Sequence, residues 1–151
     1  MKTITIGGKD YKVEYSIEAS LYPDLTGALM DSLISIGVGK GAAESNDTNT
    51  VFETMKNTVS NMPVKALTLF HAGLLEHHDL SFDESKELFK QYIRESKKSA
   101  YDVFSELMTE VNNDNFFEMI GLDEMFPTDE KKKTRKSKNS TEVGENTSTE
   151  E

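Results

Sequence analysis

Apolar residues recur every three or four positions through most of this sequence, which is the spacing of one face of an α-helix. The pattern is clearest in five runs, at residues 21–36, 52–59, 67–75, 88–93 and 103–111. A chain of 151 residues has room for one domain of ordinary size, with or without a tail. The sequence therefore predicts a compact bundle of about five helices.

The first 16 residues follow a different pattern. In residues 3–6 and 11–15, apolar or aromatic side chains alternate with polar ones, which is the period of a half-buried β-strand. Gly7 and Gly8 lie between the two runs and readily adopt the positive φ of a tight turn. We expect a β-hairpin over residues 1–16, packed on the helices because two strands alone are only marginally stable. The predicted fold class is α+β and mainly α-helical.

Glycine, proline and polar residues predict the helix ends. Gly37 is a natural helix stop, and the following residues are rich in Gly, Asn and Asp, so we expect a flexible loop over residues 37–50. Pro63 is expected to open a separate helix over residues 64–78. A hydroxyl residue followed three positions later by an acidic one predicts three other helix starts, at Thr50, Ser81 and Ser99.

The charges divide the chain into a body and a tail. The formal net charge is −10, but residues 128–151 contain six acidic and six basic residues and only one hydrophobic residue, Val143. Such a segment buries too little apolar area to offset its chain entropy, so we expect a disordered tail after an acidic domain at residues 1–127. An acidic body argues against nucleic-acid binding, and the apolar runs are too short to cross a membrane.

The sequence contains no recognisable catalytic or metal-binding motif. Cysteine is absent. His71 and His78 share the apolar face of one predicted helix about 10.5 Å apart along its axis, too far to bind one metal ion together, and His77 points elsewhere. We expect buried or half-buried histidines with hydrogen-bond partners and a mild pH sensitivity near 6.5. The prediction is a protein that is not an enzyme and holds no cofactor or metal.

The segment at residues 116–126 is unusually apolar for a final short helix. The interpretation we favour is that it docks on the domain's own core. The alternative is a helix that enters a groove of a partner. In that case the partner-binding residues are Phe116, Phe117, Met119, Ile120, Met125 and Phe126.

Three parts of the chain together resemble the tail assembly chaperones of long-tailed bacteriophages and prophages of Gram-positive bacteria. These parts are the opening residues 1–15, the predicted helix at 83–97, and the apolar segment 116–126 before a charged tail. The resemblance implies a non-enzymatic protein of the host bacterial cytoplasm that binds and solubilises the tape-measure protein and helps to recruit tail-tube subunits. It also implies absence from the mature virion and leaves self-association open.

Many such families make a longer second product by a programmed ribosomal frameshift. Lys131, Lys132 and Lys133 are encoded by A-rich codons that suit such a slip, which is a hypothesis that the gene sequence tests.

Other functions remain as alternatives. The first is an acidic phage-encoded inhibitor that binds a basic host protein by nucleic-acid mimicry, and it predicts salt-sensitive binding. A structural tail subunit would be rich in β-sheet, and an enzyme of unknown type would need a site that the sequence does not reveal.

Overall fold

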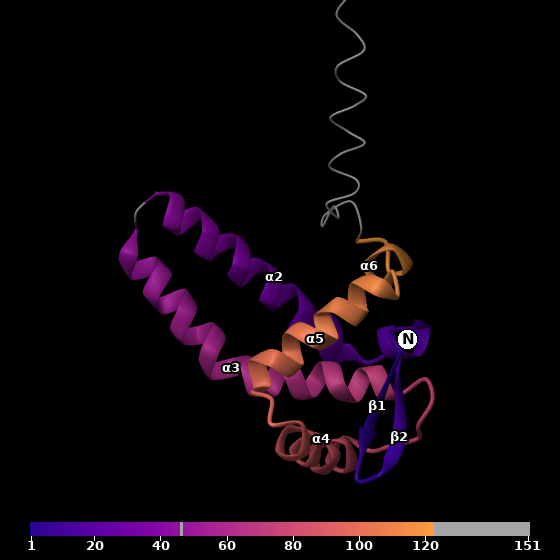
Figure 1. Cartoon of the computed structure of the whole chain (residues 1–151). Helices are drawn as coiled ribbons and strands as arrows, with labels where there is room; N and C mark the ends of the chain where they lie inside the picture. Colours follow the sequence, from indigo (N-terminus) through magenta and orange to yellow (C-terminus); the bar gives the residue numbers. More distant parts are fainter. Residues whose placement is uncertain (46, 123–151) are drawn as a thin grey trace, which may run out of the picture.

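The computed structural model describes residues 1–45 and 47–122. In that part the chain forms a two-stranded antiparallel sheet and six helices (Figure 1). In chain order these elements are β1 (Lys2–Ile6), β2 (Lys9–Val13), α1 (Ile17–Ser20), α2 (Pro23–Glu44), α3 (Thr48–Leu74), α4 (Phe82–Ser96), α5 (Ala100–Asn113) and α6 (Phe116–Met119). The predicted α+β, mainly α-helical fold is confirmed. The tail predicted at residues 128–151, with Lys131, Lys132 and Lys133, lies outside the described residues.

The N-terminal hairpin forms as the alternating pattern predicts. β1 and β2 pair from Lys2 opposite Val13 to Ile6 opposite Lys9. Gly7 and Gly8 join them with φ angles of 57° and 75°, in the left-handed region that the favoured two-residue hairpin turns require. The inward side chains of the hairpin are buried and pack on α3 and α4, as a pair of strands without further strands requires.

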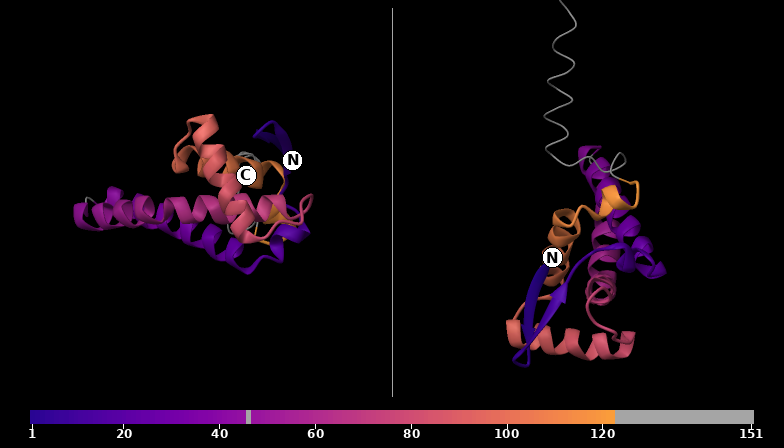
Figure 2. Two further views of the ribbon diagram at one scale, coloured as in Figure 1. Left: turned by 90° about the horizontal axis from the view of Figure 1, so that it is seen from below. Right: turned by 90° about the vertical axis from the view of Figure 1, so that its right-hand side faces the viewer.

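α3 is the central element, and α1, α2, α4, α5 and β2 all pack against it. Its C-terminal half carries much of the core, including Ala66, Leu69, Phe70 and Leu74, which are fully buried. Figure 1 and the left view of Figure 2 show the other elements gathered around this half, whereas the N-terminal half projects away with α2 beside it. The body is therefore compact around one end of α3, and a helical hairpin extends from it.

The prediction of a flexible loop at residues 37–50 is wrong. α2 continues to Glu44, and α3 already begins at Thr48. Asp47 is the N-cap of α3 and accepts a hydrogen bond from the backbone N–H of Thr50 at 3.2 Å, so Thr50 is a helical residue and not the cap. Glycine inside a helix costs only about 0.5–1 kcal/mol relative to alanine. Packing of α2 along α3 offsets a loss of this size.

The prediction that Pro63 begins a separate helix is also wrong. Pro63 lies inside α3, which runs as one helix of 27 residues. Proline lacks an N–H and crowds the preceding turn, and this combination bends a helix when packing keeps both sides helical. Figure 1 shows α3 changing direction near its middle, where Pro63 lies. The proline signal thus marks a bend in α3 and not a boundary.

The other two predicted helix starts are confirmed. Ser81 and Glu84 form a reciprocal capping box at α4, and Ser99 and Asp102 form one at α5. These caps satisfy backbone N–H groups that the first turn of a helix leaves without a partner. The capping box at Ser99 fixes the start of α5. The apolar face of α5 is part of the core, and its buried residues are Val103, Phe104, Leu107 and Val111.

Candidate functional site

The structure divides the predicted partner-binding segment between the core and the surface. Phe116 is fully buried and Phe117 is 8% exposed. The Phe116 and Tyr15 rings pack edge-on, with 6.2 Å between their centroids. Ile120 is half-buried against the same core, and Met119 is 36% exposed. The prediction of Phe116 and Phe117 as partner contacts is therefore corrected, because a partner cannot reach buried side chains without unfolding this end of the domain.

The turn before α6 explains this placement. Asn115, the N-cap of α6, follows the C-cap of α5 and adopts a left-handed φ of 55°, which redirects the chain so that the two phenylalanines return to the core. The interpretation that the segment docks on its own domain holds for Phe116, Phe117, Ile120 and Leu122, but not for the exposed Met119. Met125 and Phe126 lie outside the described residues.

All three histidines have hydrogen-bond partners, as predicted. The buried His71 bonds through Nδ1 to Oγ of Ser85 at 2.9 Å, and Nε2 of His78 accepts the backbone N–H of Lys12 at 3.0 Å. Burial lowers the pKa of both side chains below the ordinary value of 6.5. His71 joins α3 to α4. His78 lies beyond the end of α3 at Leu74, and not on that helix as predicted, and it joins the connection after α3 to the hairpin. Both histidines have this structural role in the neutral form.

His77 makes the third of these contacts. Its Nε2 atom lies 2.7 Å from a carboxylate oxygen of Glu14 on the surface. Within residues 1–45 and 47–122, no group of three or more His, Asp or Glu residues is arranged to hold a metal ion.

An exposed apolar surface lies on the projecting half of α3. Phe52, Met55 and Val59 are 66%, 62% and 70% exposed, and we call these three residues the arm surface. The sequence shows their helical spacing but not their exposure, because exposure depends on whether another element covers them. Ile34 of α2 and Tyr101 of α5 are further exposed apolar side chains.

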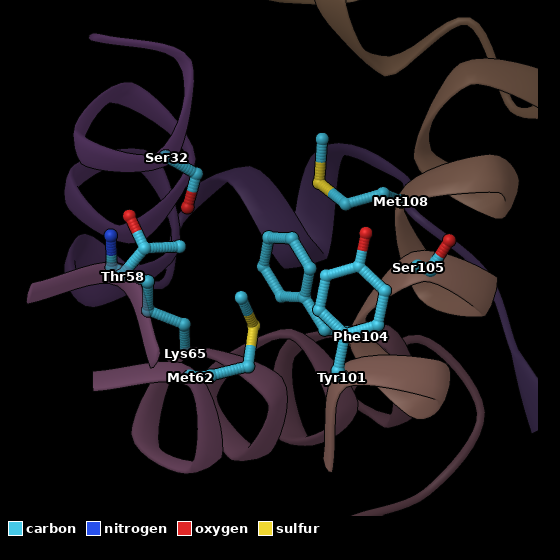
Figure 3. A pocket seen from close by; sticks show the side chains of 8 residues that line it. All are labelled: Ser32, Thr58, Met62, Lys65, Tyr101, Phe104, Ser105 and Met108. Atoms are coloured by element: carbon cyan, nitrogen blue, oxygen red, sulfur yellow. The ribbon is translucent and has the colours of Figure 1, made fainter. Parts of the chain in front are cut away.

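A pocket of about 350 Å³ lies between α2, α3 and α5. It is lined by Ser32, Thr58, Met62, Lys65, Tyr101, Phe104, Ser105 and Met108. Figure 3 shows Met62, Tyr101, Phe104 and Met108 gathered around the same space, with hydroxyl groups and the Lys65 side chain at its margin. The lining contains no carboxylate or imidazole, so it suits an apolar side chain better than acid–base chemistry.

Glu106 fixes the position of the pocket's α5 wall. Its carboxylate accepts from Lys2 of β1, and from Lys98 and the Tyr92 hydroxyl on the α4 side. Burial raises the pKa of Glu106, but hydrogen bonds to Lys2 and Lys98 outweigh this effect, and the net pKa is lowered. The ionised side chain therefore ties together three elements next to the pocket.

Comparison with known proteins adds no assignment to this geometry. The chain matches no protein family, and no similar curated protein or solved structure was found. Among the helices that the structure describes, none is both long enough and apolar enough to span a membrane.

Proposed function

We propose that this protein is a non-enzymatic tail assembly chaperone of a long-tailed bacteriophage or prophage. In this proposal it binds the tape-measure protein in the host bacterial cytoplasm, keeps it soluble and helps to recruit tail-tube subunits. The observation that supports this proposal best is the arm surface, three large apolar side chains left in solvent on a helix that projects from a well-packed body.

The physical requirements of such a chaperone agree with these features. A long helical partner exposes apolar faces before it is assembled, and an apolar surface with an adaptable residue such as Met55 can cover them. A net charge of −10 keeps the loaded complex soluble by repulsion between complexes. Because the partner must later be released, several modest contacts serve better than one tight interface.

Co-expression tests the proposal. The full chain is produced together with the tape-measure protein of the same phage or prophage, and the soluble fraction of that protein is measured with and without the chaperone. We expect a recoverable complex and a clear increase in the soluble fraction. An equally insoluble partner with no complex would refute the proposed function.

Salt dependence separates this function from nucleic-acid mimicry. Binding through apolar side chains persists or strengthens in high salt, whereas binding of an acidic surface to a basic host protein weakens steeply. A complex that survives a high-salt wash supports the chaperone. Loss of the complex in the same wash favours the acidic inhibitor.

A further inference from the structure

Six apolar side chains and one glycine of α3 form a seam that runs from Phe52 to Gly73. From Phe52 onward the spacing alternates strictly between three and four residues, through Phe52, Met55, Val59, Met62, Ala66, Leu69 and Gly73. This alternation is the heptad pattern by which one helix packs along another. The seam crosses Pro63 without losing its register.

Burial along the seam changes abruptly. Phe52, Met55 and Val59 are 66%, 62% and 70% exposed, whereas Met62, Ala66 and Leu69 are 6% exposed or less. α5 packs on α3 and lines the pocket beside Met62, and the hairpin closes over the last seam position, Gly73. In the body, other elements therefore cover the seam. From Val59 toward the N-terminus of α3, no described residue buries it.

The pocket lies where the seam changes from buried to exposed. Met62, the last buried seam residue, lines the pocket together with Phe104 of α5 and Thr58 of α3. Val59, the next seam residue toward the arm, is 70% exposed. An element that covered the arm surface would thus end over an apolar hollow that can receive one large side chain.

We propose that the arm surface and this pocket bind one amphipathic α-helix of a partner protein. Its apolar residues recur at alternating spacings of three and four, and one of them enters the pocket. The inference rests on the proposed function, in which the bound molecule is another polypeptide. It adds which surface of this protein binds that polypeptide and which spacing of apolar residues the surface recognises. The seam from Phe52 to Met62 is about 15 Å long, so the bound segment needs about three helical turns.

Continuity with the buried interface argues for a helix as the occupant. α3 already packs against α5, with Met62 of the seam beside Phe104 at the pocket, and the spacing of three and four residues continues unchanged through the arm surface. Charge argues for a foreign helix over a second copy of this chain, because two copies with a net charge of −10 each repel one another.

A designed peptide tests this recognition without the natural partner. The probe is a labelled helical peptide of about 21 residues, with leucine at alternating spacings of three and four and lysine on its polar face. A control peptide has the same composition in scrambled order. Binding to the full chain is measured by fluorescence anisotropy, in buffers that contain enough salt to suppress simple charge attraction.

One triple variant and one double variant allow a matched comparison of peptide binding. Phe52→Ser/Met55→Ser/Val59→Ser removes the arm surface, and Ile17→Ser/Leu21→Ser removes two equally exposed apolar side chains on the α1 side. Because all five residues are exposed, we expect both variants to fold like the wild type by circular dichroism. We expect the arm variant to bind the patterned peptide at least about tenfold more weakly, and the α1 variant to bind it normally.

Three outcomes would overturn the inference. The first is equal binding of the patterned peptide by the wild type and the arm variant. The second is a wild-type dimer that the arm variant converts to a monomer, which would assign the surface to a second copy. The third is tighter peptide binding after Met125→Ser/Phe126→Ser, which would assign it to the chain's own C-terminal segment. If the arm variant still solubilises the tape-measure protein, the proposed function stands and only this inference fails.

Discussion

The backbone N–H of Glu14 donates to the carbonyl oxygen of Gly73 at 2.8 Å. Gly73 lies in the last turn of α3, where helix carbonyls lack a partner within the helix, so the chain leaving β2 supplies one. The approach is too close for a side chain. A Cβ atom at Gly73 would lie 2.6 Å from Cγ1 of Val13 and 3.2 Å from Cζ of Tyr15.

Replacing this glycine should loosen the hairpin. In Gly73→Ala the new methyl group meets Val13 and Tyr15, which are both buried and cannot move aside freely. We expect a loss of about 1–3 kcal/mol in the free energy of unfolding, measured by urea denaturation.

Gly27 of α2 is the matched control, because a Cβ atom there would meet nothing within 4 Å. Gly27→Ala should leave stability unchanged or raise it by up to about 1 kcal/mol. Equal effects of the two substitutions would mean that helix propensity, and not the contact with the hairpin, decides the result at Gly73.

Local signals in the sequence predicted the elements that depend on neighbouring residues. The hairpin follows from alternation around Gly7 and Gly8, and the starts of α4 and α5 follow from Ser81 and Ser99 with their acidic partners. The close approach at Gly73 has no such signal, since it depends on a strand 60 residues earlier in the chain.

The errors arose where tertiary packing overrides local preference. Glycines after residue 36 lower helix propensity, and Pro63 removes one helix hydrogen bond, yet α2 and α3 both continue because they pack along each other. The candidate site was missed for the same reason. The spacing of Phe52, Met55 and Val59 predicts an apolar face, but only the fold reveals that nothing among the described residues buries it.

Phe117→Asp should abolish the native fold. Phe117 is 8% exposed beside the fully buried Phe116, and a carboxylate there would lose most of its hydration in an apolar environment. We expect a flattened thermal transition and reduced helical content by circular dichroism.

Met119→Asp is the control for this substitution, because Met119 lies on the same short helix but is 36% exposed. It should change stability by no more than about 0.5–1 kcal/mol. A well-folded Phe117→Asp protein would contradict the assignment of Phe117 to the core.

Acid should weaken the fold through His71 and His78 before the carboxylates respond. Burial lowers the pKa of both histidines, so between that lowered pKa and 6.5 the unfolded chain binds more protons than the folded one. Their contribution is therefore complete above pH 6.5 and is lost as the pH falls from 6.5 to the lowered pKa of the folded state. Urea midpoints should decrease from about pH 7 to about pH 5.

The double variant His71→Gln/His78→Gln isolates this effect. Glutamine does not titrate, so the decrease between pH 7 and 5 should become shallower even if the variant is less stable at every pH. An unchanged slope would assign the acid sensitivity to other groups. Glu84, Glu95 and Asp102 also have lowered pKa values, through hydrogen bonds from Ser81, Gly7 and Ser99 respectively, but they respond at lower pH.

Glu106→Gln should destabilise the protein more than the loss of an ordinary surface ion pair. The substitution keeps the shape of the side chain but leaves two ammonium groups, of Lys2 and Lys98, next to each other without the carboxylate between them. We expect a loss of about 1–2 kcal/mol at neutral pH, since the Glu106 side chain is only 17% exposed. Glu87→Gln is the control, because Glu87 pairs with Lys90 at 2.6 Å but both side chains are largely exposed, and it should lower the free energy of unfolding much less than Glu106→Gln. Urea denaturation in low and high salt measures both variants. High salt should reduce the repulsion between Lys2 and Lys98 and so bring the stability losses of the two variants closer together. Equal losses for both variants in low salt would show that Glu106 is an ordinary surface charge.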